Sequence, residues 1–485
     1  MHRSMKLINP LVILRILSTI LLIEALLYLS CIPVALIYNE SPDPFLWSSA
    51  IAGFIYLVLR TISWKAKIEK ISNRDGYLAV TLSWLVFSLL GTLPYIISGT
   101  IPTFINAFFE STSGFTTTGS SILTNVEILP FSMHFWRSMT HWIGGLGIVV
   151  LVIIILPSLR ITNYHLFSLE SSLKEKIHPK TKAIGYRLLF IYLGLTLAEI
   201  LLLVVGDMNL FESICHTFGT VATGGFSTRN LSIASFSVYS QYIIMIFMFL
   251  AGVSFIVYYY AIKLNFRKVL HNEELWFYSA TIIIAGTLAT SILIAKTTRP
   301  FEPAFREGFF HIISIITTTG YSNADYLLWP ISGVILIFLL CFTGASTGST
   351  TGGIKMGRHL LVIKNISSVL RKILHPRLVS QIKLNGKVLS WSANVSIISF
   401  VIIYIFIFVA GTVLISICGT DPVTSASAVA SSLGNIGPGL GSIGPLFNYA
   451  HMPEISKVIL SLLMIIGRLE IITVFVIFTR AFWKL

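Results

Sequence analysis

The feature that most constrains this chain is a series of apolar segments, each long enough to cross the ~30 Å hydrocarbon core of a bilayer. Hydrophobic residues make up 55% of the 485 residues and charged residues only 11%, too few to cover a water-exposed surface. The sequence therefore predicts an all-α polytopic membrane protein. We expect ten spans, near residues 11–38, 45–62, 76–98, 132–158, 184–206, 236–262, 275–296, 330–355, 391–418 and 455–481.

The distribution of Lys and Arg predicts the orientation of these spans. If successive spans cross the membrane in alternating directions, every second connection lies on the same side. On one side these segments are 1–10, 60–75, 159–187, 263–275, 355–390 and the last few residues, and they contain 26 of the 34 Lys and Arg residues. The other side carries Arg229, Lys296, Arg299 and Arg306. Because positive loops stay in the cytoplasm, both termini are expected to be cytoplasmic. The net charge of +14 does not lie on a soluble domain, so we expect no nucleic-acid partner, and the basic loops can instead contact anionic lipid.

Four connections on the outer side contain apolar stretches that are too short to span a bilayer. They are Phe104–Phe115, Phe211–Phe218, Phe305–Ile316 and Thr424–Leu433. One such stretch could be an interfacial helix. Four of them, always on the same side, indicate re-entrant helices.

A glycine-centred loop follows each of these short stretches. The loops read Thr117–Ser120, Ala222–Gly225, Thr318–Tyr321 and Asn435–Pro438. Aligning Gly119, Gly224, Gly320 and Gly437 gives intervals of 105, 96 and 117 residues. This fourfold recurrence predicts four repeats of first span, pore helix and second span around a pseudo-fourfold pore. We expect an N-terminal two-helix hairpin at 1–70, followed by repeats at 71–165, 166–265, 266–375 (with a broken second helix) and 376–485.

Backbone at membrane depth must line a watery cavity or be buried in protein. Four loops around one axis can point carbonyl oxygens at a dehydrated cation, glycine allows the positive φ that this requires, and the C-terminal ends of the preceding helices add negative potential. The expected filter residues are Thr117, Thr118, Gly119, Ala222, Thr223, Gly224, Thr318, Thr319, Gly320, Asn435, Ile436 and Gly437.

The eighth span is interrupted by Thr343–Gly353, which has four glycines and six hydroxyl residues and is a poor helix former. It is either a gate below the third filter loop or a flexible packing contact. The residues expected to form the gate are Gly344, Ser346, Gly348, Thr350, Gly352, Gly353 and Arg468. Arg468 lies in the middle of the last span, where it would oppose cation passage or form an ion pair with Glu470 or another carboxylate.

Other motifs point away from catalysis. Glu110, Glu212, Glu307 and Asp421 lie in or just before the pore helices, either as helix caps or as a vestibule that attracts cations. The sequence has no HExxH, no Cys/His cluster, no paired Cys and no GxxxxGK[ST]. The GxGxxG at Gly439–Gly444 lacks the strand that a dinucleotide site needs. We therefore expect neither an enzyme nor an organic cofactor.

The chain resembles the superfamily of K+ transporters that includes the Trk, Ktr and HKT proteins, and within it the membrane subunits of bacterial Trk potassium uptake systems. The resemblance covers essentially the whole chain. The motifs that carry it are Thr116–Ser120, His141–Gly147, Thr220–Phe226, Thr317–Tyr321, Leu433–Gly439 and Gly344–Lys355.

The resemblance implies uptake of K+ and Rb+ across the bacterial inner membrane, with K+ as the bound, transported ion. It implies a homodimer, a cytosolic nucleotide-binding regulatory ring of the TrkA type, and gating by the intramembrane loop and Arg468. Asn435, Ile436 and Pro438 depart from the TVGYG pattern of tetrameric K+ channels, so poorer rejection of Na+ is expected. An H+- or Na+-coupled symporter is the alternative, although such carriers usually have inverted repeats, whereas these repeats share one orientation.

Overall fold

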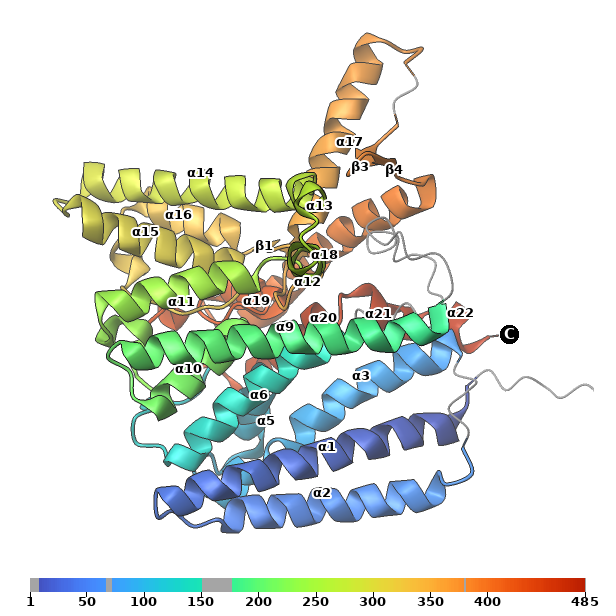
Figure 1. Cartoon of the computed structure of the whole chain (residues 1–485), viewed down its shortest axis with the longest axis vertical. Coiled ribbons are helices and arrows are strands. Elements are labelled where there is room, and N and C mark those ends of the chain that lie inside the picture. Colours follow the sequence, from blue (N-terminus) through green and yellow to red (C-terminus); the bar gives the residue numbers. More distant parts are fainter. Residues whose placement is uncertain (1–7, 67–71, 151–176, 379–380, 485) are drawn as a thin grey trace, which may run out of the picture.

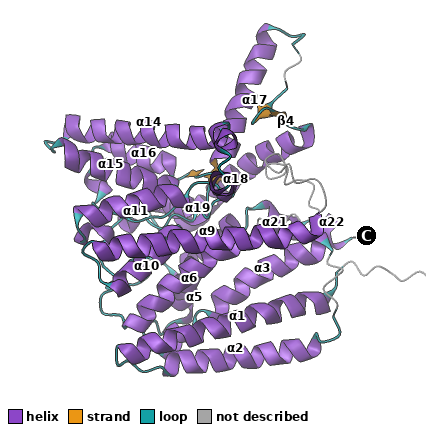
Figure 2. Ribbon diagram, in the orientation of Figure 1, coloured by secondary structure: helices purple, strands orange, loops and turns teal. Residues whose placement is uncertain are grey.

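The computed structural model describes residues 8–66, 72–150, 177–378 and 381–484, and most of them are helical (Figure 1, Figure 2). Several long helices run in nearly the same direction in Figure 1, among them α1 (Pro10–Ile37), α2 (Asp43–Ile62), α9 (Ile177–Val205) and α14 (Glu273–Lys296). The end of the expected span 132–158 and the expected unit boundaries at 70 and 165 lie outside the described residues.

The first two helices form the expected N-terminal hairpin. α1 packs along α2 and also contacts α3 (Asn73–Leu90) of the first repeat. The fully buried Tyr28 on α1 donates its hydroxyl to Glu24, at 3.0 Å, and to the carbonyl oxygen of Leu90, at 2.8 Å. These polar contacts hold the hairpin against α3.

Four repeats follow, each with a first span, a short pore helix, a loop and a second span. Repeat 1 consists of α3, α4 (Leu93–Ile97), α5 (Phe104–Phe115) and α6 (Phe131–Val150). Repeat 2 consists of α9, α10 (Leu210–Val221), η2 (Ser232–Ser235), α11 (Val238–Ala251) and α12 (Phe255–Ile262), with α13 (Phe266–Leu270) after it. Repeat 3 consists of α14, α15 (Phe301–Ile316), η3 (Tyr326–Leu328), α16 (Ile331–Leu340), β1 (Thr343–Gly344), β2 (Ile354–Lys355) and α17 (Met356–Leu374). Repeat 4 consists of α18 (Trp391–Ile417), α19 (Pro422–Gly434), η4 (Gly441–Ile443), α20 (Glu454–Arg468), α21 (Ile472–Phe475), η5 (Val476–Phe478) and α22 (Arg480–Trp483).

A small antiparallel hairpin lies between repeats 3 and 4. β3 (Lys383–Leu384) pairs with β4 (Lys387–Val388) across the turn residues Asn385 and Gly386. Both turn residues have positive φ, 50° and 75°, which is the pattern of the tight Asn-Gly hairpin turn.

The pore helices are short because local signals start them and glycine-containing loops end them. Asn209 caps α10 by accepting the amide of Glu212, and Asp421 caps α19 by accepting the amides of Val423 and Thr424. Every residue of α5 from Ala107 onward is buried. These helices are therefore enclosed by the longer spans, as the re-entrant interpretation requires.

Six described helices are long and apolar enough to cross a membrane, or eight spans if two bent pairs are each counted as one. Two of the spans expected to be continuous are bent in the described residues. The expected span 236–262 bends by 94° between α11 and α12, and the expected span 455–481 bends by 104° after Arg468. The expected span 330–355 is interrupted as predicted, because the ten-residue helix α16 is followed by β1 and β2 rather than by a continuous helix. At the bend between α11 and α12, another repeat satisfies free backbone groups, through the bond from the Phe255 amide to the Gly348 carbonyl, which local sequence does not show.

Candidate functional site

All four pore helices end in the same hydrogen-bonded turn. In a Schellman motif, one amide after the helix bonds back three residues and the next bonds back five residues. Here the short bonds join Thr117 to Gly114, Thr223 to Thr220, Thr318 to Ile315 and Asn435 to Ser432, and the long bonds join Thr118 to Ser113, Gly224 to Gly219, Thr319 to Ser314 and Ile436 to Ser431. The repeats are thus equivalent at the level of individual hydrogen bonds.

This equivalence corrects the alignment of the second loop. Each loop has two residues in left-handed conformation, two positions apart. The first is Thr117, Thr223, Thr318 or Asn435, with φ of 50°, 57°, 52° and 54°. The second is Gly119, Gly225, Gly320 or Gly437, with φ of 80°, 83°, 80° and 106°. Gly225 therefore takes the position that the sequence alignment gave to Gly224. Gly224 occupies the position of Thr118, so the expected set Ala222, Thr223 and Gly224 is shifted by one residue.

The four loops, which we call the filter loops (116–120, 222–226, 317–321 and 434–438), pack directly against one another. A Cβ at Gly119 would overlap the carbonyl oxygen of Gly224, and a Cβ at Gly225 would overlap that of Thr319. The same relation joins Gly320 to Ile436. Glycine is required here because the backbone of the next loop occupies the space of a side chain.

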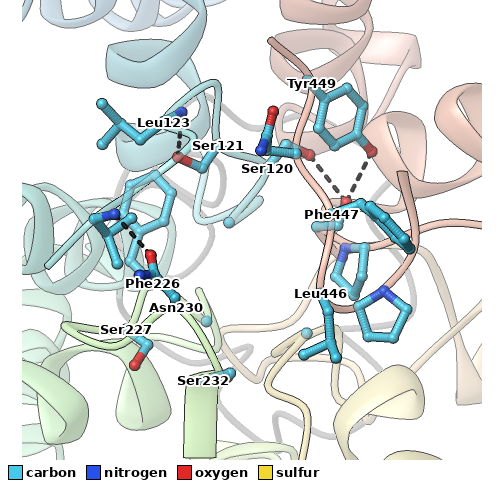
Figure 3. A pocket seen from close by; sticks show the side chains of 18 of the residues that line it. Ser120, Ser121, Leu123, Phe226, Ser227, Asn230, Ser232, Leu446, Phe447 and Tyr449 are labelled. Atoms are coloured by element: carbon cyan, nitrogen blue, oxygen red, sulfur yellow. Dashed lines mark hydrogen bonds between the residues drawn. The ribbon is translucent and has the colours of Figure 1, made fainter. Parts of the chain in front are cut away.

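The four left-handed glycines line one cavity of about 130 Å³ (Figure 3). Its other lining residues include Ser120 and Phe226, which end the first two filter loops, and Tyr449 of the fourth repeat. Because all four repeats contribute a glycine, the cavity lies at the outer mouth of the filter loops.

A closed ring of hydrogen bonds surrounds this mouth. In every repeat the carbonyl oxygen two residues after the glycine accepts a hydrogen bond from the preceding repeat. The four bonds run from the Tyr449 amide to Ser121 at 2.8 Å, from the Arg137 guanidinium to Ser227 at 3.3 Å, from the Ile233 amide to Ser322 at 3.0 Å, and from the Tyr326 hydroxyl to Gly439 at 2.7 Å. These carbonyl groups therefore face protein donors and fix the width of the mouth.

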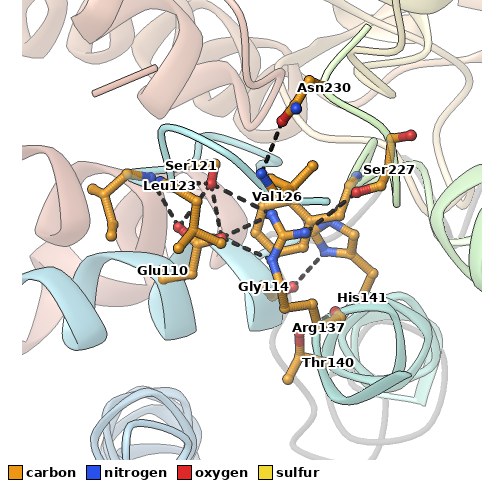
Figure 4. A network of polar contacts seen from close by, with 12 residues as sticks. Glu110, Gly114, Ser121, Leu123, Val126, Arg137, Thr140, His141, Ser227 and Asn230 are labelled. Atoms are coloured by element: carbon orange, nitrogen blue, oxygen red, sulfur yellow. Dashed lines mark hydrogen bonds and ion pairs between the residues drawn. The ribbon is translucent and has the colours of Figure 1, made fainter. Parts of the chain in front are cut away.

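Arg137 takes part in this ring because a buried carboxylate orients it (Figure 4). Glu110, on α5, is fully buried and accepts bonds from Arg137 Nε at 3.0 Å and Nη2 at 2.9 Å. Glu110 also accepts the amide of Ile122 and the hydroxyl of Ser121. The guanidinium lies 4.1 Å from the centre of the Phe226 ring. Glu110 therefore joins the first two filter loops rather than capping its helix.

The other three carboxylates near the pore helices also have protein partners. Glu212 forms an ion pair with Arg229 at 2.5 Å, and Glu307 forms one with Arg299. Asp421 is a helix cap, and the hydrogen bonds from the side chain and amide of Thr424 hold the pKa of its carboxyl below the usual value. The cap interpretation therefore holds for Asp421, whereas the other three carboxylates take part in ion pairs.

Below the filter loops lies the gate segment, residues 343–353. It begins with strand β1 and is followed directly by strand β2. The two strands pair in parallel, with Thr343 opposite Ile354 and Gly344 opposite Lys355. The residues between the two strands therefore form a loop, which we call the excursion, and this loop brings β2 back alongside β1. Residues 345–352 of this excursion are all buried.

The excursion contacts the pore-helix ends of three repeats. The Thr350 hydroxyl donates to the carbonyl oxygen of Val221, the last residue of α10, at 3.2 Å. The Gly352 amide donates to the Thr318 hydroxyl at 2.8 Å, and a Cβ at Gly352 would overlap the carbonyl oxygen of Gly434. The gate segment therefore fills the space beneath the filter loops.

The bend between α11 and α12 is stabilised by the same segment. The Ser346 amide donates to Gly252 at 3.0 Å, and the Phe255 amide donates to Gly348 at 3.1 Å. These bonds satisfy the backbone groups that the broken span leaves free.

Arg468 holds the gate segment from the opposite side. Its guanidinium is buried and donates to the carbonyl oxygens of Thr350 at 2.6 Å and Gly144 at 3.0 Å. Glu470 forms an ion pair with Arg358, at 2.5 Å, and among the described residues no ion pair of Arg468 is found, so the alternative interpretation of Arg468 as a partner of Glu470 is not supported. Arg468 thus brings a positive charge next to the gate segment and links that segment to α6.

A buried carboxylate fixes both ends of the excursion. One oxygen of Glu274, on α14, accepts the amide of Thr347 at 2.6 Å and the amide of Gly357 at 2.8 Å. The ammonium of Lys355 donates to the carbonyl and hydroxyl oxygens of Thr351. Sequence reasoning missed Glu274 and the ion pair of Arg358, because Thr347 and Glu470, their partners, are distant in the chain.

The arrangement is suited to a dehydrated monovalent cation rather than to a chelated metal. Across the described ranges no three His, Cys, Asp or Glu side chains come together as a metal site. The groups that meet at the filter loops are backbone carbonyls at the negative ends of four helices. Such groups can replace part of the hydration shell of an ion.

Comparison with known proteins gives a consistent result. The TrkH family, described as cation transport protein, matches residues 48–484. The "Trk system potassium uptake protein TrkI" of Halomonas elongata is 32% identical over 480 residues, 97% of this chain and 96% of its own length. The "Trk system potassium uptake protein TrkH" of Escherichia coli is 32% identical over 470 residues, 93% of this chain and 94% of its own. The crystal structure of the potassium transporter TrkH from Vibrio parahaemolyticus superimposes with a TM-score of 0.90 at 29% identity, covering 98% of this chain and all of that one.

Proposed function

This chain belongs to the TrkH family of cation transport proteins, and from that premise we propose that it takes up K+ through the four filter loops. As a member of this family, it is a multi-pass membrane protein that transports K+. The observation that carries the filter proposal is the convergence of Gly119, Gly225, Gly320 and Gly437 on one cavity, with the loop carbonyls packed between them. K+ and Rb+ bind there by exchanging water for carbonyl oxygens, and Na+ is rejected less strongly because the fourth loop differs from the others.

We further propose that the gate segment and Arg468 block the path in the state described here. Residues 345–352 are buried beneath the filter loops, at the point where a permeating ion would emerge from the filter. Arg468 adds a positive charge at the same level, which opposes a cation. The gate opens when the excursion moves away from Val221 and Thr318.

The flux of 86Rb+ into liposomes containing the purified protein tests this function. With a K+ gradient alone, we expect uptake that external K+ competes with strongly and Na+ weakly. A Gly119→Ser variant, matched by Gly194→Ala on α9, where an added Cβ meets open space, separates filter damage from general damage. Uptake that appears only with an imposed H+ or Na+ gradient would replace this proposal by the symporter. No selective uptake at all would refute both.

Location and partners are also proposals. The excess of Lys and Arg on one side supports insertion in the bacterial inner membrane with both termini in the cytoplasm. On that side α17 extends away from the helix bundle (Figure 1). It exposes apolar residues at helical spacing, which are Ile363, Ile366, Val369, Leu370, Ile373 and Leu374. This face fits another protein surface, and we propose a second copy of the chain and a cytosolic nucleotide-binding ring of the TrkA type as the occupants of the cytoplasmic side.

A further inference from the structure

The four filter loops are not equivalent at the carbonyl group of the left-handed glycine. The carbonyl oxygen of Gly437 accepts three hydroxyl donors, from Tyr449 at 2.8 Å, Ser431 at 2.8 Å and Ser120 at 3.1 Å. Within the described part of the chain, no donor reaches the corresponding carbonyl oxygens of Gly119, Gly225 and Gly320. The fourth repeat therefore differs at one atom from the other three.

The number of donors decides what this oxygen can do. A carbonyl oxygen has two lone pairs, so three hydroxyl donors leave none for a cation. All three donors are buried: Ser431 is 0%, Ser120 1% and Tyr449 2% exposed. Water cannot easily replace these donors, and the oxygen stays occupied whether or not an ion is present.

The backbone conformation of Gly437 also differs from that of the other three filter glycines. Gly437 has a φ of 106°, whereas Gly119, Gly225 and Gly320 lie between 80° and 83°. The peptide after Gly437 is therefore rotated relative to its three counterparts, and the residue that follows is Pro438.

The bonds from these donors occur only at the fourth filter loop among the described residues. Ser431 lies six residues before its glycine, and the residues at the same offset are Ser113, Gly219 and Ser314. The Ser113 hydroxyl has no partner, Gly219 has no side chain, and Ser314 bonds one residue further on, to the Tyr321 carbonyl at 2.7 Å. Tyr449 is held in place by the hydrogen bond from its backbone amide to the Ser121 carbonyl. Its ring also packs against Phe109, with 5.3 Å between the ring centres.

We propose that the outermost ring of the filter has three ion-facing carbonyls, those of Gly119, Gly225 and Gly320, and that Tyr449, Ser431 and Ser120 hold the Gly437 carbonyl out of the ion path. A cation at this level keeps a water molecule in place of the fourth carbonyl. Tyr449 and Ser431 then limit selectivity, because discrimination between K+ and Na+ depends on how many carbonyls coordinate the ion. This inference rests on the proposed function.

Counting lone pairs gives a non-additive expectation for variants. Tyr449→Phe or Ser431→Ala alone leaves two donors, which still occupy both lone pairs, so selectivity should stay near that of the wild type. The double variant leaves only Ser120, frees one lone pair and allows the peptide to turn toward the ion. We expect the Na+ concentration that halves 86Rb+ uptake to rise by about fivefold in the double variant, the factor that corresponds to one hydrogen bond.

A matched control separates this effect from loss of a buried hydroxyl. Tyr28→Phe removes a buried hydroxyl donor from another backbone carbonyl, that of Leu90 beside the N-terminal hairpin and outside the filter loops, and should leave Na+ inhibition unchanged. If the first double variant does not fold, as judged by thermal unfolding and gel filtration, Tyr449→Phe with Ser120→Ala makes the same test.

Each outcome is decisive. A folded double variant with wild-type or stronger Na+ inhibition, or an equal shift in Tyr28→Phe, would overturn the inference. A wild-type protein that carries no selective 86Rb+ flux would instead refute the proposed function, so the two failures are distinguishable.

Discussion

Arg358 and Glu470 form an ion pair, with 2.5 Å between Nη2 and Oε2, that joins the beginning of α17 to the bend in the last span. Arg358 lies in the first turn of α17, five residues after the end of the gate segment, and its guanidinium lies 3.9 Å from the centre of the Phe400 ring. Glu470 has a φ of 57° and lies two residues from Arg468. The ion pair therefore links α17 to the bend beside Arg468, the residue that donates to the gate segment.

We predict that Glu470→Gln weakens this link and raises basal 86Rb+ flux several-fold in liposomes. The reason is that the buried Arg358 charge loses its partner, so the closed arrangement is stabilised less. Glu302→Gln is the control, because it removes a carboxylate from an exposed ion pair with Arg306 on α15. Flux equal to that of the wild type in a folded Glu470→Gln variant would mean that the pair is only structural.

We predict that Arg468→Ala raises basal flux by about tenfold or more, since a hydrogen bond to a charged group contributes about 1.5–3 kcal/mol. The variant loses the bonds to Thr350 and Gly144 and the positive charge beside the ion path. Arg468→Lys keeps the charge without the planar fork and should give an intermediate flux. If Arg468→Ala is folded and its flux is unchanged or lower, the gate proposal loses its electrostatic part.

The spans and the recurrence of short helices were accessible from sequence because they depend on local properties. Apolar length predicts a span, and the same Gly-centred loop after each short helix predicts a repeat. The register of the second loop was not accessible in the same way, since Gly224 and Gly225 are adjacent and either can align with Gly119. The signal was the spacing Thr-x-Gly, shared by Thr117 and Gly119 with Thr223 and Gly225.

The polar partners were not accessible because they depend on tertiary contacts. Arg468 bonds a carbonyl oxygen 324 residues earlier in the chain, and Glu274 bonds the amide of Thr347, 73 residues away. The break before Phe255 is stabilised by Gly348, on another repeat. Hydropathy reports none of these contacts, so the sequence placed Arg468 in a span but did not identify the carbonyl oxygens that it binds.

We predict that Gly225→Ser weakens the discrimination of K+ over Na+, measured by Na+ inhibition of 86Rb+ uptake, as much as Gly119→Ser does. A Cβ at Gly225 would overlap the backbone carbonyl of Thr319, and the residue has a φ of 83°, which a side chain disfavours. Gly194→Ala, in open space on α9, should behave as the wild type. Intact selectivity in folded Gly225→Ser would show that the filter register is not the one described by the backbone.

We predict that Glu110→Gln lowers thermal stability, by about 3–5 kcal/mol, the usual cost of breaking a buried ion pair. The residue is 0% exposed and paired with Arg137, so its charge neutralises a guanidinium rather than attracting ions to the mouth. The measurement is thermal unfolding in detergent together with the K+ concentration that gives half-maximal uptake. A variant with normal stability and a weaker apparent K+ affinity would instead support the vestibule interpretation.

The last prediction concerns the fit of the gate segment beneath the filter loops. Gly352 approaches the end of α19 so closely that a Cβ would overlap the carbonyl oxygen of Gly434, and its amide is bonded to the Thr318 hydroxyl. Neither neighbour is the flexible end of a long side chain, so Gly352→Ala must push the gate segment away from the filter loops. We expect a raised basal 86Rb+ flux in liposomes, and a larger increase when residues 346–351 are shortened.

The control for Gly352→Ala is Ser346→Ala, which removes a buried hydroxyl that has no hydrogen-bond partner and adds no atom to the same segment. Its flux should equal that of the wild type. If Gly352→Ala and the shortened variant both assemble normally and neither leaks, the segment only fills space and the barrier lies elsewhere. If they leak only to K+ and Rb+, the filter loops keep their selectivity without the gate segment, which would separate the two functions physically.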